Sequence, residues 1–159
     1  MAQIDLLRLL DLYKILIPVE VRNEVVDKGK IKGYSDALLI EKKIEEGSIK
    51  EIKIEIDDKF EAAAQIAGLL KAEITVIYYA YKKEIIALLD DDAARIFARG
   101  LGIKVKGTLG VLIYGFNNKL ISHQETLSGL NKLSQMMYFS ADLYQLVLKQ
   151  LEKSSKHGF

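Results

Sequence analysis

The sequence predicts an α/β fold: a three-layer αβα domain in which helices cover both faces of a short parallel sheet. Helix-like and strand-like stretches alternate through most of the 159 residues, and right-handed crossovers join parallel strands in that order. In addition, Ile85 to Leu89 is a continuous apolar run, as expected of a strand buried on both faces. We therefore predict one domain, residues 1–153, and a flexible tail, residues 154–159.

The first elements follow from leucine spacing and from one proline. Ile4 to Leu12 is a leucine-dense helical stretch with Asp5 in its first turn, where the helix dipole favours an anion. Tyr13 to Ile17 is predicted as a short buried strand. Pro18 stops that strand and suits the first turn of a helix, which is expected to end at Gly29.

The next segment combines a helix, an edge strand and a second helix. Ser35 to Glu46 has helical periodicity and is followed by Gly47, a common helix terminator. Ile49 to Ile56 is predicted as a strand; from Ile52 onward apolar and charged residues alternate, which indicates a half-exposed strand near a sheet edge. Phe60 to Leu70 is alanine-rich and is predicted to be helical.

The second half continues the alternation around the buried strand at residues 85–89. A brief strand is predicted at Ile103 to Val105, because glycines bound a short β-branched stretch. Ser140 is a candidate N-cap for the last helix. The predicted helices of this half are Ala72 to Lys82, Asp92 to Arg99, Thr108 to Phe116, Gln124 to Leu133 and Ala141 to Leu151.

Composition limits the possible functions. Lys and Arg total 23 and Asp and Glu total 22, so the net charge of +1 gives no basis for tight nonspecific duplex binding, although a local basic face could hold RNA. The chain has no cysteine, which excludes disulfides and thiolate zinc sites. With no long apolar run and no signal-peptide pattern at the N-terminus, the sequence predicts a cytoplasmic protein.

Three consecutive aspartates, Asp90 to Asp92, stand where the buried strand stops. In open parallel sheets, ligands bind beyond the carboxyl ends of the strands, so carboxylates there indicate a metal or polar site. The alternative is that Asp91 or Asp92 caps the following helix.

Five motifs in order resemble the PIN-domain superfamily, most closely a poorly characterised prokaryotic branch of predicted nucleic-acid-binding proteins. They are a Leu-Asp-Leu-Leu helix, an Ile-Pro-x-x-Val-x-x-Glu junction, a Glu-Ala-Glu helix, an Asp-Asp-x-x-Ala-Arg turn and a Gly-Thr-Leu-Gly-Val-Leu helix. Here the first three correspond to IDLLRLL, ILIPVEVRNEV and AEITVI, and the last two lie together in LLDDDAARIFARGLGIKVKGTLGVL. The likeness covers nearly the whole chain.

The resemblance implies a metal-dependent ribonuclease, since PIN domains use three or four carboxylates to hold Mg²⁺ or Mn²⁺, and many are toxins of VapBC-type pairs. Hard divalent cations prefer oxygen ligands, and they activate water while neutralising phosphodiester charge. The implied catalytic residues are Asp90, Glu73 and Glu24, and the implied metal ligands are these three with Asp91. Within the triplet we expect Asp90 to be a ligand and Asp92 to be the helix cap.

One family feature has no counterpart. A first strand carrying an aspartate should precede the Leu-Asp-Leu-Leu helix, but this sequence starts almost at that helix. Asp5 matches the aspartate of the helix and not that of the strand. Either the sequence starts late or the strand has been lost. In both cases we expect a PIN-like domain without the usual first strand and with an incomplete carboxylate site.

Each implied ligand has a simpler alternative role. Glu24 could be surface charge on a short helix, and Glu73 could be an N-terminal helix carboxylate favoured by the dipole. Three carboxylates held together without a cation would raise one another's pKa, so a divalent ion is the natural way to relieve their repulsion.

Candidate nucleic-acid contacts surround the triplet. Arg95 and Arg99 lie four residues apart on one helix face and could contact phosphate, or Arg95 could pair with Asp91 or Asp92. Thr108 could orient a metal-bound water or cap its own helix. Exposed lysines could form a rim for RNA or simply add solubility: Lys28, Lys30, Lys32, Lys104 and Lys106.

Three functions remain open at this stage. The first is a metal-dependent endoribonuclease, with an antitoxin protein as partner. The second is a degenerate PIN-like protein that binds RNA or protein without cleaving. The third is a homo-oligomer, such as a dimer, in which another subunit covers the surface exposed by a missing strand, because unpaired backbone groups require compensation.

Overall fold

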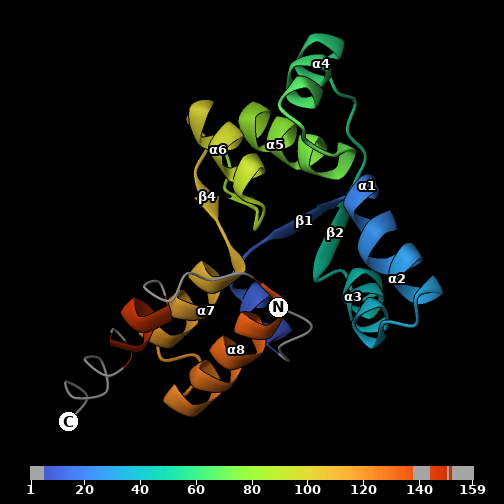
Figure 1. Cartoon of the computed structure of the whole chain (residues 1–159). Helices are drawn as coiled ribbons and strands as arrows, with labels where there is room; N and C mark the ends of the chain where they lie inside the picture. The colour runs from blue at the N-terminus through green and yellow to red at the C-terminus, as the bar shows by residue number, and fades with distance from the viewer. Residues whose placement is uncertain (1–5, 138–143, 150, 152–159) are drawn as a thin grey trace. The chain divides into compact units, whose positions relative to one another are not determined.

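The computed structural model describes residues 6–137, 144–149 and 151 (Figure 1). The chain divides into two compact units. The larger unit runs from Leu10 to Thr108, and the smaller unit combines Gln3–Leu9 with Leu109–Phe159. The fold is mixed α/β, as the alternating pattern predicted, and it is mostly helical. Within the part of the chain that the structure describes, the strand pairs lie in the larger unit.

The larger unit contains two separate pairs of parallel strands. β1 (Ile15–Pro18) pairs with β2 (Ile49–Ile52), and β3 (Ala87–Leu88) pairs with β4 (Val105–Lys106). The parallel direction is confirmed, but the described residues form two small sheets instead of the single sheet predicted. Parallel pairing requires a long crossover, and the helices between the strands provide it.

Helices fill the crossovers of the larger unit. After the 3-10 helix η2 (Leu7–Leu12), the chain passes through β1 into three consecutive short helices, then into longer ones on either side of β2 and β3. The short ones are α1 (Val19–Arg22), the π-helix η3 (Asn23–Asp27) and α2 (Lys28–Ile31), and the longer ones are α3 (Ser35–Glu45), α4 (Asp58–Ile66), α5 (Lys71–Lys83) and α6 (Asp92–Gly100).

Two predicted boundaries are wrong for identifiable reasons. Gly29 does not end a helix: it is buried, and a Cβ added there would lie 2.9 Å from the Cβ of Ala37. Glycine at this position therefore lets α2 and α3 approach closely, and the helical segment continues to Ile31. β2 stops at Ile52 because its partner β1 ends at Pro18, which is opposite Ile52 in the register.

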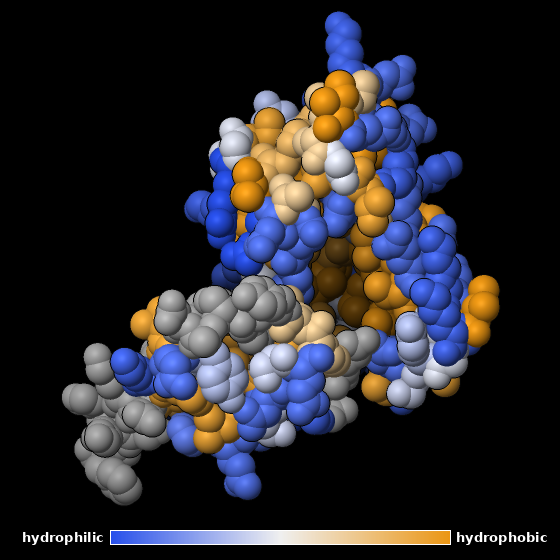
Figure 2. All heavy atoms as spheres, in the orientation of Figure 1, coloured by the Kyte–Doolittle hydropathy of each residue, from blue (hydrophilic) through white to orange (hydrophobic). Residues whose placement is uncertain are grey.

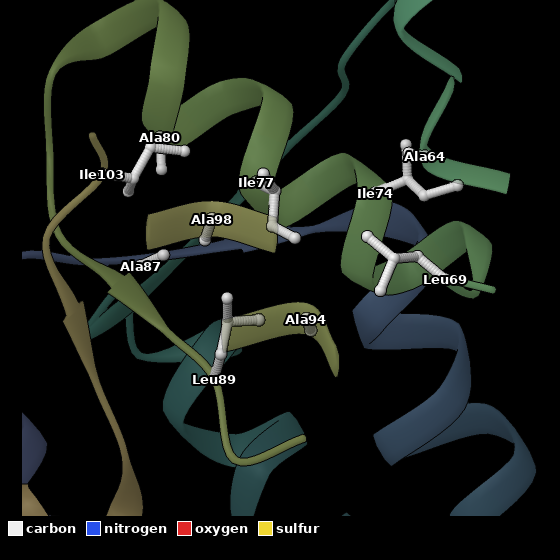
Figure 3. Packing of buried hydrophobic residues seen from close by; sticks show 10 residues of the cluster. All are labelled: Ala64, Leu69, Ile74, Ile77, Ala80, Ala87, Leu89, Ala94, Ala98 and Ile103. Carbon is white, nitrogen blue, oxygen red and sulfur yellow. The ribbon is translucent and has the colours of Figure 1, made fainter. Parts of the chain in front are cut away.

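A hydrophobic cluster of the larger unit lies between α4, α5, α6 and the β3–β4 pair. Figure 3 shows its buried side chains, in which Ile74 and Ile77 of α5 face Ala94 and Ala98 of α6 across the cluster. Burying one isoleucine side chain contributes about 1.5–3 kcal/mol to stability. Phe60 packs against the cluster, and its ring meets the ring of Tyr78 edge to face with the two centroids 5.0 Å apart, so Tyr78 is part of this packing.

Other apolar side chains stay at the surface of the same three helices. Figure 2 shows them as orange spheres over α4 to α6. The most exposed is Ile66 of α4 at 89%, followed by Ile96 of α6 at 71%. No helix among the described residues combines the length and the apolar character needed to cross a membrane.

The smaller unit is built on α7 (Thr108–Asn117) and α8 (His123–Met136). Small residues let leucines pack closely: a Cβ added at Gly115 would lie 2.8 Å from a methyl of Leu9. Ser122 and Glu125 form a capping box at the start of α8, and Arg8 donates to the Glu125 carboxylate. The predicted last helix is seen at residues 144–149 and 151; its proposed cap Ser140 and the tail 154–159 lie outside the described residues.

Candidate functional site

Asp90 follows β3 and binds the first residue of α7. Its carboxylate accepts hydrogen bonds from the backbone N–H of Thr108 at 2.7 Å and from the Thr108 hydroxyl at 2.5 Å. Gly107 makes room for this contact, since a Cβ there would lie 2.8 Å from Asp90 Oδ1. Thr108 therefore does not cap the helix with its own hydroxyl. The side chain of Asp90 satisfies the unpaired N–H at the helix start.

The remaining two aspartates have different environments. Asp91 is the N-cap of α6: its backbone is extended, and its side chain accepts from the backbone N–H of Ala94 at 2.8 Å. Asp92 is the first helical residue; its side chain is 92% exposed and lies 3.9 Å from Nη1 of Arg95. An N-cap residue precedes the first residue of its helix, and Asp92 is already the first residue of α6. The prediction that Asp92 is the cap is therefore wrong.

Glu73 is bound to the start of its own helix. The carboxylate accepts a hydrogen bond from the backbone N–H of Leu70 at 2.8 Å, which satisfies a donor that the helix cannot pair internally. This is the simpler of the two roles considered for Glu73. Glu24 is exposed on η3, the π-helical turn after β1.

The carboxylates do not form a ready metal centre. Within residues 6–137, 144–149 and 151, no group of three or more His, Cys, Asp or Glu side chains is placed to hold a metal ion. Asp90 and Glu73 already accept backbone N–H hydrogen bonds. Their oxygen chemistry suits a hard cation, but the described arrangement does not fit a site that needs several carboxylates together.

The candidate nucleic-acid contacts are only partly at the surface. Arg99 and Lys104 are exposed. Lys106 instead donates to the Tyr13 hydroxyl at 2.9 Å, and its ammonium lies 5.0 Å from the centre of that ring. This contact links β4 to the residues that precede β1 within the larger unit.

Two buried polar atoms were not anticipated from the sequence. Glu20, in the first turn of α1, has a buried Oε2, and Arg95 has a buried Nε; neither atom has a hydrogen-bond partner among the described residues. A buried polar atom without a partner is unfavourable. The position of Glu20, just beyond the end of β1 at Pro18, was the available signal, since ligands bind beyond the carboxyl ends of parallel strands.

Comparison with models of protein families shows to which family this chain belongs. The model of the DUF3368 family, described as a PIN domain, matches residues 1–153. The chain belongs to the PIN-domain family. No curated protein and no solved structure matches it. The PIN resemblance inferred from the five motifs is thus confirmed over nearly the whole chain, and the parallel strand pairs are consistent with a PIN-like α/β domain.

Proposed function

We propose that this PIN-family chain is related to the metal-dependent endoribonucleases of the VapC type but has an impaired cleavage site. The proposed metal ligands are Asp90, Asp91, Glu73 and Glu24, and the proposed ion is Mg²⁺ or Mn²⁺. Family membership supports a nuclease-related function. The capping roles of the acidic side chains support the loss of efficient cleavage.

One observation carries the proposal. The Asp90 carboxylate accepts two hydrogen bonds from Thr108, yet it is exposed at the end of a parallel strand, where a cation could still approach. A cation there would have to compete with Thr108 and would find no preassembled set of carboxylates among the described residues. Binding is therefore expected to be weak.

Calorimetric titration with Mn²⁺ tests the site. We expect weak binding by the unmodified chain and none by the double variant Asp90→Asn with Glu24→Gln. A matched control, Glu55→Gln with Asp58→Asn, removes the same charge from exposed positions outside the proposed site. Absence of Mn²⁺ binding by the unmodified chain, or equal binding by the double variant, rules out the site.

Cleavage is tested by incubating single-stranded RNA with the protein and Mn²⁺. We expect little or no product. Efficient cleavage that Asp90→Asn abolishes would show that the site is intact and would contradict the impairment.

The alternative function is a non-catalytic RNA- or protein-binding homo-oligomer. The exposed Arg99 and Lys104 favour it, because both carry a positive charge that is accessible to a phosphate backbone. RNA retention without cleavage, lost in Arg99→Ala with Lys104→Ala, would support RNA binding. Arg95, Lys106 and Thr108 complete the proposed RNA contacts, and an antitoxin protein is a further proposed partner.

A further inference from the structure

The side chain of Arg95, on α6, reaches the end of β3 at which Asp90 stands. A Cβ added at Gly107 would lie 4.0 Å from Nη1 of Arg95 and 2.8 Å from Oδ1 of Asp90. Nη1 and Oδ1 can therefore be no farther apart than the sum of these two distances. That sum is shorter than the Debye length, which is about 8 Å at physiological ionic strength, so dissolved salt does not fully screen the two charges from each other.

The packing of α6 restricts where Arg95 can lie. Ala94, the preceding residue, is buried in the hydrophobic cluster of the larger unit (Figure 3). The Arg95 side chain is 34% exposed, and its Nε is buried without a hydrogen-bond partner among the described residues. The positive charge of Arg95 is thus held against the protein surface.

Among the described residues, Arg95 does not orient Asp90 through a hydrogen bond. The Asp90 carboxylate accepts instead from the N–H and the hydroxyl of Thr108. Arg95 forms its ion pair with Asp92, at 3.9 Å, and this pair is weak because the Asp92 side chain is 92% exposed. The effect of Arg95 on Asp90 is therefore electrostatic and acts through space.

A divalent cation bound to Asp90 would be repelled by this charge. The repulsion between a divalent ion and a guanidinium is twice that between two single charges at the same distance. Other carboxylates do not offset it, since the part of the chain that the structure describes holds no group of three or more His, Cys, Asp or Glu side chains placed around an ion. The end of β3 does not fit a PIN-type metal centre, because a positive charge stands where such a centre would gather negative ones.

We propose that Arg95 is a built-in positive charge beside Asp90 that opposes the binding of a divalent cation there. This role rests on the proposed function, because it gives the physical cause of the weak Mn²⁺ binding proposed for the same site. Removing the charge should therefore raise the affinity for Mn²⁺. A purely structural role of Arg95 would leave the affinity unchanged or lower it.

Electron paramagnetic resonance of Mn²⁺ tests the proposal, because the sharp signal of the free ion broadens when the ion binds. The titration is made at an ionic strength of about 0.01 M, where the Debye length is about 30 Å. We expect Arg95→Gln to bind Mn²⁺ at least fivefold more tightly than the unmodified chain, and this gain should shrink as salt is added. Arg95→Lys keeps the charge and should bind within about twofold of the unmodified chain.

Two further variants locate the effect. Lys83→Gln removes the same charge from an exposed position before β3, at the opposite end of that strand from Asp90, and should change the affinity by less than about twofold. Adding Asp90→Asn to Arg95→Gln should abolish the gain. Circular dichroism checks that each variant is folded. Arg95→Met, which keeps an unbranched side chain without the charge, takes the place of Arg95→Gln if the latter is unfolded.

The outcomes separate this role from the proposed function. The proposed function fails if the unmodified chain binds no Mn²⁺, whereas the role of Arg95 is measured as a difference between two chains. Binding by Arg95→Gln that Asp90→Asn abolishes supports the role even if the unmodified chain does not bind. Equal or weaker binding by Arg95→Gln, no binding by either chain, or a gain that persists with Asp90→Asn would overturn it.

Discussion

Substituting Gly107 by alanine should disconnect Asp90 from Thr108. The added Cβ would lie 2.8 Å from Asp90 Oδ1, the same atom that accepts the Thr108 N–H at 2.7 Å, and 3.4 Å from the carbonyl oxygen of Leu89. The carboxylate must move, because the backbone on either side is held by β4 and α7. Both hydrogen bonds to Thr108 are then weakened.

The expected cost follows from two opposing effects. Loss of a helix cap lowers the free energy of unfolding by about 0.5–2 kcal/mol. Because Asp90 is exposed, we expect the loss of its hydrogen bonds to cost about 1 kcal/mol. Alanine also restricts the unfolded chain, which stabilises the folded state by about 0.4–1 kcal/mol where the backbone tolerates it. Gly110→Ala is the matched control, since nothing lies within 4 Å of its added Cβ. We expect Gly110→Ala to be more stable than Gly107→Ala by about 1–2 kcal/mol.

Urea unfolding at neutral pH, combined with a double-mutant cycle, measures the effect. With Asp90→Ala in place, no carboxylate remains to be displaced, so Gly107→Ala should cost about 1 kcal/mol less than in the unmodified chain. Additivity of the two substitutions to within about 0.5 kcal/mol would refute the proposed collision. Equal stability of the Gly107 and Gly110 variants would refute it as well.

Two further predictions concern helix starts. Two hydrogen bonds lower the pKa of Glu125 from 4.5 to about 2: the larger effect comes from the backbone N–H of Ser122, and the next largest from the side chain of Arg8. Its stabilising contribution should be complete above pH 4.5 and decline as the pH falls toward 2; in Glu125→Gln this part of the pH dependence should disappear, and an unchanged profile would contradict the assignment. At α6, thermal unfolding should show that Asp91→Ala costs about 1 kcal/mol and Asp92→Ala at most about 0.5 kcal/mol; the reverse order would restore Asp92 as the cap.

Local features of the sequence determined most of the elements. The sequence predicted α3, α5 and α7 close to their observed limits, because the residues that start and end a helix lie close together in the chain. Five ordered motifs identified the PIN family. Gly29 was misassigned because glycine is common both at helix ends and where two helices approach closely. Only the nearby Ala37 side chain shows that the second role applies here.

Only the tertiary structure decided what the acidic residues do. The sequence by itself placed Asp90 at the end of a strand and Glu73 in the first turn of a helix, and both assignments hold. Whether Asp90 meets Thr108, eighteen positions away, or another carboxylate depends on how strands and helices pack, which no local pattern contains. Likewise, the apolar run at residues 85–89 predicted a strand buried on both faces, and this is wrong: Ala87 and Leu89 are buried, but Ile85, Ile86 and Leu88 are exposed. Burial and pairing depend on long-range packing, which the local sequence does not contain. Among the described residues, β1 pairs with β2 and β3 pairs with β4, although both β1 and β3 contact α5.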